Sequence, residues 1–185
     1  MYPKRSTKAI LLKSYDINEK DKALVLFTRN LGLLHTRAIS MRSASSKLKQ
    51  NALSYILLDV TLVQGKGGFR LVEAENSKYH VSQIDPDKLQ ALFGALKALL
   101  KFMPQNETHS RLFDLLLQDI THVLEKDTSR LELYKLKMLY NIFTSLGYVN
   151  NAEHSYIQEP GVEFVLQNKR EIQKAIFQAE KVAQI

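Results

Sequence analysis

Residues 23–39 read ALVLFTRNLGLLHTRAI, two apolar runs separated by Asn30-Leu31-Gly32. Runs of six or seven apolar, β-branched and aromatic residues are typical of strands, and Asn and Gly tolerate the positive φ that a tight turn needs. The stretch therefore predicts a β-hairpin with strands at residues 23–28 and 33–39. It decides the fold because segments of the same kind flank it on both sides.

The flanking segments complete a small β domain. Residues 7–15, 55–63 and 69–74 have strand composition, and Gly65-Lys66-Gly67-Gly68 forms a turn between the last two. That turn is no phosphate-binding loop, because neither the Lys-Ser/Thr ending nor a following helix is present. Five strands joined by short turns leave no room for crossover helices. The pattern predicts a five-stranded antiparallel OB-type β-barrel.

The second half of the chain has helical spacing of its apolar residues. Asp85-Pro86 is a strong helix start, and a capping box at residues 129–132 opens a later helix that Gly147 ends. Residues 149–168 look irregular, and residues 168–183 predict a final amphipathic helix. The fold class is therefore α+β, with a barrel domain at residues 1–80 and an all-α helical domain at residues 81–185.

Positive charge is concentrated in the barrel half. Residues 1–80 contain 14 Lys and Arg against 6 Asp and Glu, whereas residues 81–185 contain 12 against 13. Between Asp21 and Asp59 there is no acidic residue at all. Clustered cations without carboxylates in the sequence around them are typical of a polyanion-binding surface, most often for nucleic acid. The alternative is a solvated basic face that keeps the protein in solution.

A single-strand binder needs cations for the phosphates and aromatic faces for the bases. The candidate phosphate contacts are basic residues of the barrel half, the first five within the strands and loops of the acid-free window: Arg29, Arg37, Arg42, Lys47 and Lys49, followed by Lys13, Lys66 and Arg70. For Lys13 and Arg70 a solvated surface position is the favoured interpretation. We expect the strand aromatics to belong to the core instead of the binding surface: Tyr15, Phe27, Tyr55 and Phe69.

Several classes of function are disfavoured by what the sequence lacks. Without cysteine there is no disulfide, thiolate zinc site or cysteine nucleophile. The five histidines show no metal-binding spacing, and nucleophile elbows and dinucleotide-binding glycine patterns are missing. We therefore expect no enzyme activity, no cofactor and no metal. The apolar runs are too short to cross a membrane, which predicts a cytoplasmic protein.

The order of several segments resembles the bacterial RecO recombination mediators. These segments are Lys8 to Lys13, residues 19–28 with Glu19-Lys20-Asp21, Leu31-Gly32-Leu33-Leu34, Arg42 with Ser46-Lys47-Leu48, and residues 65–75, followed by Leu112 to Leu116 and Leu139 to Tyr148. The sequence departs from the family in two places. Residues 38–42 keep only the Ala and the Arg of a basic Ala-Lys-Gly-Ala-Arg motif, and the four cysteines of a zinc site are missing.

The resemblance implies a protein that binds single-stranded and double-stranded DNA and promotes strand annealing. It also implies that RecA is loaded onto DNA together with RecR and single-strand-binding protein. Charge alone leaves two alternatives open, an RNA-binding OB-fold accessory factor and a non-enzymatic adaptor whose basic face meets an acidic protein. The family resemblance favours the DNA-binding mediator.

Overall fold

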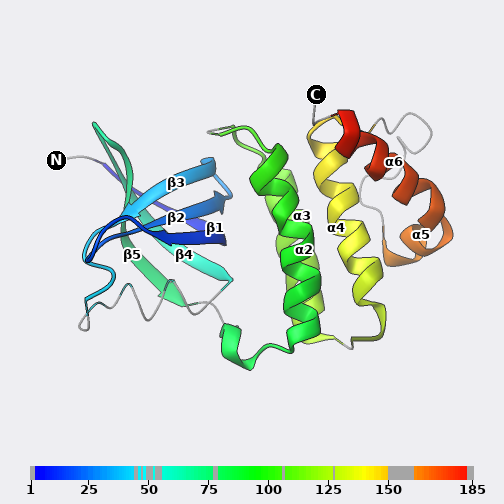
Figure 1. Cartoon of the computed structure of the whole chain (residues 1–185), viewed down its shortest axis with the longest axis horizontal. Helices are drawn as coiled ribbons and strands as arrows, with labels where there is room; N and C mark the ends of the chain where they lie inside the picture. Colours follow the sequence, from blue (N-terminus) through cyan, green and yellow to red (C-terminus); the bar gives the residue numbers. More distant parts are fainter. Residues whose placement is uncertain are drawn as a thin grey trace. The chain divides into compact units, whose positions relative to one another are not determined.

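The N-terminal part of the chain folds into a closed barrel of five strands (Figure 1). The structure is a computed structural model that describes residues 3–43, 46, 48, 52, 56–76, 79–105, 107–126, 128–149 and 161–182. The strands are β1 (Lys4–Asp16), β2 (Lys22–Thr28), β3 (Gly32–Ala38), β4 (Leu57–Gly65) and β5 (Gly68–Asn76). They follow one another around the barrel in the order β1-β2-β3-β5-β4. The predicted five-stranded OB-type barrel followed by helices is confirmed.

One strand pairing differs from the purely antiparallel barrel that the sequence predicts. Four strand pairs are antiparallel, but β3 and β5 run parallel, with Thr36 beside Phe69 and Arg37 beside Arg70. Parallel strands need a long connection, which residues 39–67 supply because they include all of β4. No turn joins β3 to β5, so the local turn signals gave no information on their relative direction.

A β-bulge in β1 determines which of its side chains face outward. The register between β1 and β2 shifts between Leu11 and Lys13, so that Leu12 is an extra residue. Ala9 and Leu11 pack into the barrel core, and strict alternation would also place Lys13 and Tyr15 there. One extra residue reverses the alternation. Lys13 and Tyr15 consequently lie on the outer face of the barrel.

The barrel core is made of side chains from alternating strand positions. These are small and medium-sized aliphatic residues, which suit the interior of a small barrel: Ala9, Leu24, Leu26, Leu34, Ala38, Leu58, Val60, Leu62, Leu71 and Ala74, together with Met41 and Ala52. Strand β2 is buried along nearly its whole length on both faces. Its continuous apolar sequence reflects that double burial.

A glycine fixes the turn between β2 and β3. Gly32 has a φ of +72°, and a Cβ at this position would lie 2.0 Å from the backbone oxygen of Glu107. The Thr28 hydroxyl donates to the Gly32 carbonyl oxygen (2.9 Å) and accepts from the Leu31 amide (3.1 Å). Both the backbone conformation and the close approach of Glu107 therefore require glycine.

The helices of the second half are α2 (Pro86–Phe102), α3 (Ser110–Glu125), α4 (Leu131–Ser145), α5 (Val162–Gln167) and α6 (Lys169–Val182), with short 3-10 turns η1 (Val81–Gln83) and η2 (Thr128–Arg130) (Figure 1). Helix α4 packs against α2, α5 and α6. The Asp85 carboxylate accepts from the Asp87 and Lys88 amides as the predicted cap of α2. Gly147, with a φ of +77°, follows the end of α4 as predicted.

Two helix predictions are wrong. The capping box at residues 129–132 does not form, because η2 occupies Thr128–Arg130 and α4 begins at Leu131 without a side-chain cap. The segment 149–168, predicted to be irregular, contains helix α5 at Val162–Gln167. A helix of this length is too short to show the periodicity that identifies longer ones. The final predicted helix is confirmed as α6.

The chain forms two compact units. The barrel unit consists of Met1–Ile84 and Pro104–Ser110, and the helical unit consists of Asp85–Met103 and Arg111–Ile185. The link between α2 and α3 thus belongs to the barrel unit, where Gln105 bridges to Leu33. No local sequence signal indicates this, since the link lies between two helices. Among the described residues no helix has the length and apolar character that crossing a membrane requires.

Candidate nucleic-acid interface

Two of the predicted cations lie side by side on the outer face of the barrel. Arg37 of β3 is in register with Arg70 of β5 on one side and with Ala23 of β2 on the other. Ala23 is in turn opposite Tyr15 of β1. Residues opposite one another on paired strands share a face of the sheet. We call these four residues the outer row: Tyr15, Ala23, Arg37 and Arg70.

Further polar side chains flank the outer row. Lys13 lies two residues before Tyr15 on the same face of β1, and His35 lies two residues before Arg37 on β3. Lys66 is exposed in the turn between β4 and β5, four residues before Arg70. Lys20 is exposed in the turn between β1 and β2, the other loop that OB folds commonly use to bind oligonucleotides.

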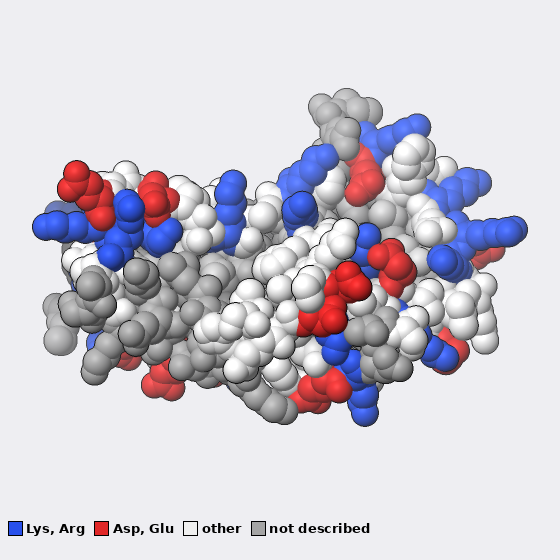
Figure 2. All heavy atoms as spheres, turned by 60° about the horizontal axis from the view of Figure 1, so that its bottom comes forward, with Lys and Arg blue, Asp and Glu red and all other residues white. Residues whose placement is uncertain are grey.

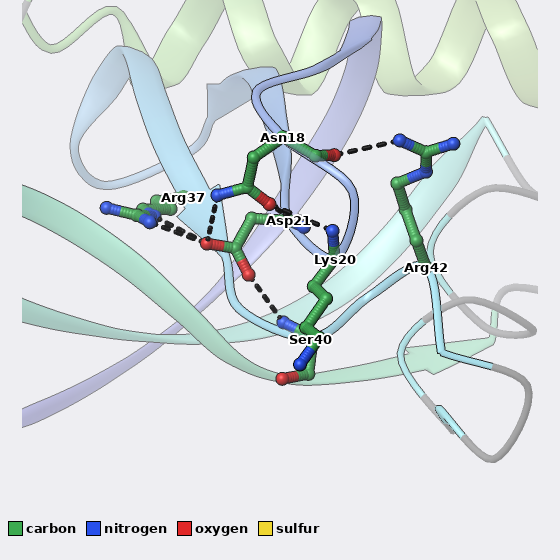
Figure 3. Close-up of polar contacts among 6 residues, drawn as sticks. All are labelled: Asn18, Lys20, Asp21, Arg37, Ser40 and Arg42. Carbon is green, nitrogen blue, oxygen red and sulfur yellow. Dashed lines mark hydrogen bonds and ion pairs between the residues drawn. The ribbon is translucent and has the colours of Figure 1, made fainter.

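A buried aspartate holds the loops at one end of the outer row (Figure 3). Asp21 is only 6% exposed, and its Oδ2 accepts from Arg37 Nε (3.1 Å) and Nη2 (2.5 Å). Asn18 Nδ2 donates to the same oxygen (3.1 Å), and the Ser40 amide donates to Oδ1 (2.9 Å). Ser40 has a φ of +55°, a conformation that few residues other than glycine adopt. Asp21 thus joins the β1–β2 turn to the segment after β3.

These contacts favour the ionised form of the carboxylate. The pKa of Asp21 is lowered from 3.8 to about 2, first by the hydrogen bond from the Ser40 amide and then by those from Arg37 and Asn18. Asp21 is therefore negatively charged at neutral pH. Although it compensates the charge of Arg37, the Arg37 side chain remains 55% exposed and retains N–H groups that Asp21 does not use.

Arg42 is held by the same turn (Figure 3). Its Nη1 donates to the Asn18 carbonyl oxygen (2.8 Å) and lies 3.5 Å from Asp16 Oδ2. Asp16 also pairs with Lys22 at 2.5 Å, and the hydrogen bond from Lys22 lowers the pKa of Asp16. The acid-free window of the sequence is thus not free of acid in space, because aspartates before the window fold back onto its arginines.

The remaining predicted cations differ in position. Arg29 follows β2 at the end opposite to Ala23, about 20 Å away along the strand, so the structure does not bring it to the outer row. Lys47 and Lys49 lie outside the described residues and stay a prediction, as does the aromatic Tyr55. Lys13, Lys66 and Arg70 are exposed, and within the described residues no carboxylate pairs with them.

The outer face of β4, and that of β5 beyond Arg70, carries negative charge. Asp59 of β4 and Glu73 and Glu75 of β5 are exposed there. Lys8 approaches Asp59 at 3.5 Å, and Lys4 approaches Glu73 at 3.0 Å. Figure 2 shows a face of the barrel unit, at the left, on which acidic side chains stand among the Lys and Arg side chains. These acidic side chains disfavour a polyanion there, which leaves the outer row, with Arg70 near the start of β5, as the more suitable surface.

The sequence reasoning missed one exposed aromatic residue. Tyr15 was expected in the core but is 43% exposed, whereas Phe27 is fully buried and Phe69 packs against the core as expected. The bulge at Leu12 is the reason, since one extra residue places the side chains that follow it on the opposite faces of β1. No group of three His, Asp or Glu residues in the described parts of the chain is placed to hold a metal ion.

Comparison with known proteins confirms the resemblance that the sequence suggests. Residues 1–79, which include all five strands, match the family described as "Recombination protein O N terminal". The DNA repair protein RecO of Dehalococcoides mccartyi is 28% identical over 143 residues, 77% of this chain and 56% of the relative. The DNA repair protein RecO of Synechococcus elongatus is 24% identical over 166 residues, 89% of this chain and 62% of the relative. The chain therefore spans about three fifths of the length of these curated relatives.

Proposed function

We propose that this RecO-like chain binds DNA on the outer face of its barrel and acts as a mediator in recombination and repair. The observation that carries the proposal is the coincidence of two features. The segment that matches the N-terminal domain of recombination protein O is the barrel, and the barrel places Arg37 beside Arg70 on an exposed face. Adjacent guanidinium groups suit the phosphates of a nucleic-acid backbone.

Charge neutralisation is the proposed mechanism. Lys13, Lys66 and Arg70 have no carboxylate partner among the described residues, so they release counterions when they meet phosphates. Arg37 and Arg42 are oriented by the Asp21 and Asn18 contacts and add directed hydrogen bonds. Screening of two strands by one basic surface lowers their mutual repulsion, which promotes annealing. No covalent chemistry is needed for this activity.

Protein partners follow from the resemblance to RecO proteins. We propose that the chain works with RecR and single-strand-binding protein to load RecA onto DNA, and that the helical unit supplies a surface for such partners. These roles belong to longer proteins, of which this chain spans about three fifths. They are therefore to be tested after DNA binding itself.

The first test is fluorescence anisotropy of a labelled single-stranded DNA titrated with the protein over a series of salt concentrations. Five cations at the face (Lys13, Arg37, Arg42, Lys66 and Arg70) give a slope of log K against log salt of about −3.5, at about 0.7 per phosphate contact. The Lys66→Ala/Arg70→Ala variant leaves every described ion pair intact. We expect weaker binding and a slope shallower by about 1.4.

A matched control removes the same two charges from the helical unit. Arg170 and Lys174 are exposed on α6, and their replacement by alanine is expected to leave the slope unchanged. Equal slopes for both double variants would refute the proposed face. No binding at low salt would instead favour the adaptor function, and tighter binding of RNA than of DNA would favour the RNA-binding alternative.

A further inference from the structure

The exposed apolar side chains of the barrel unit gather at one place. Among the described residues of this unit, the large hydrophobic side chains that are exposed are Tyr15 (43%), Ile17 (46%) and Ile39 (44%). Tyr15 is near the end of β1, Ile17 begins the following turn, and Ile39 directly follows β3. The strand register relates the three positions, because Asp16 lies opposite Lys22 of β2, and Lys22 lies opposite Ala38 of β3. Tyr15 and Ile17 adjoin Asp16, and Ile39 adjoins Ala38.

The Tyr15 ring stands among cations. Ala23 alone separates it from Arg37 across the sheet, at two strand spacings or about 10 Å, and Ala23 has only a methyl side chain. Lys13 lies on the same face of β1, about 7 Å along the strand. No hydrogen bond or ring contact engages the Tyr15 side chain within the described residues. One aromatic face is thus available between positive charges on neighbouring positions.

We infer that Tyr15 is a stacking platform for an unpaired base, and that the outer row consequently selects single-stranded nucleic acid. This inference rests on the proposed function and deepens it. A base on the Tyr15 ring would place the adjoining phosphates within reach of Arg37 and Lys13, while Ile17 and Ile39 border the base with apolar surface. The bases of a duplex are stacked on one another, so their faces are not available to the ring.

Single exposed hydrophobic side chains are common on protein surfaces and need no function. This cluster differs because its members come from two segments of the chain, the end of β1 and the residue after β3, and lie beside cations. The bulge at Leu12 also has a role in this view. It takes Tyr15 out of the barrel core, where regular alternation would have buried the ring, and presents it on the basic face.

The test compares two labelled oligonucleotides of equal length, one of thymidines and one of abasic sugars. Both carry the same phosphates, but only the first has bases that can stack. The Tyr15→Leu variant keeps an apolar side chain and removes the aromatic face, whereas Tyr15→Phe keeps the face. We expect Tyr15→Leu to bind the thymidine strand at least about 5-fold more weakly, with an unchanged salt slope. Tyr15→Phe should bind within about 2-fold of the wild type, since stacking does not need the hydroxyl group.

The abasic strand serves as the internal control for folding and charge. We expect it to bind the wild type and Tyr15→Leu equally well. The Phe177→Leu variant, which alters an aromatic side chain 57% exposed on α6, should bind both strands like the wild type. If Tyr15→Leu loses affinity equally for both strands, or for neither, stacking is refuted while DNA binding stands. If the wild type binds neither oligonucleotide nor duplex, the proposed function fails together with the inference.

Discussion

Asp16 and Asp21 allow a sharp test of how the barrel uses its charges, because replacing either with asparagine changes the net charge by the same amount. Asp16 is 48% exposed at its side chain and pairs with Lys22 at 2.5 Å and Arg42 at 3.5 Å. Asp21 is buried and accepts hydrogen bonds from Arg37, Asn18 and Ser40. Electrostatics alone predicts that both variants bind DNA more tightly.

We expect the two variants to behave in opposite ways. Asp16→Asn removes a carboxylate that competes with phosphates for Lys22 and Arg42, without removing any support of the backbone. If one additional phosphate contact results, the slope of log K against log salt becomes steeper by about 0.7. The affinity of the variant relative to the wild type is then about 5-fold higher at 0.1 M salt than at 1 M salt.

Asp21→Asn changes the geometry as well as the charge. An asparagine side chain has one oxygen in place of two, and its NH₂ group would face a donor of the present network. Both Arg37 hydrogen bonds go to the Oδ2 atom of Asp21, whereas the amide of Ser40, a residue with positive φ, donates to Oδ1. The single oxygen of asparagine can therefore serve Arg37 or Ser40 but not both. We expect binding weaker than that of the wild type despite the additional positive charge.

The assay is the anisotropy titration over the salt series, with all three proteins measured side by side. Circular dichroism at each salt concentration checks that the barrel is folded. Tighter binding by Asp21→Asn, comparable to that of Asp16→Asn, would refute the view that Asp21 positions the interface. Unchanged binding by Asp16→Asn would show that Lys22 and Arg42 do not contact the DNA.

Two further predictions concern stability. Because the pKa of Asp21 is lowered from 3.8 to about 2, the stability that its charge contributes is fully present above pH 4 and is lost as the pH falls toward 2. The difference between wild type and Asp21→Asn in the free energy of unfolding, measured by urea denaturation, should therefore shrink over that range. Gly147→Ala should cost about 1–2 kcal/mol, the penalty for an L-residue with positive φ, because a Cβ meets no atom within 4 Å. Gly32→Ala should cost clearly more, since its Cβ also overlaps the Glu107 backbone; equal losses in urea denaturation would contradict this explanation.

Local signals were sufficient for much of the fold. Strand composition and turn glycines predicted all five strands, and the Asp85-Pro86 start and Gly147 predicted helix ends that the structure confirms. The parallel pairing of β3 with β5 was out of reach, because it joins residues 36–37 to residues 69–70 without a connecting turn. The capping box failed since the preceding 3-10 turn determines where α4 begins.

The candidate site was predictable in its charge but not in its geometry. Arg37, Arg42 and Arg70 could be selected by counting, yet the contacts of Asp21 with Arg37 and of Asp16 with Arg42 span 16 and 26 positions in the chain. Tyr15 was assigned to the core because a single inserted residue at Leu12 leaves no signal in the composition of the strand. Alternation along a strand shows which residues share a face, but a bulge changes that face partway along.

The distinction between anchored and unanchored cations leads to separable properties of the interface. Lys13, Lys66 and Arg70, which have no carboxylate partner among the described residues, contribute counterion release and hence the salt dependence of binding. Arg37 is held by Asp21, so besides its share of that dependence it fixes where a phosphate lies relative to Tyr15. Removal of Lys66 and Arg70 should therefore change the salt slope while the preference for base-bearing over abasic strands persists. Removal of the Tyr15 ring should do the reverse, and a barrel that used charge alone would not separate the two effects.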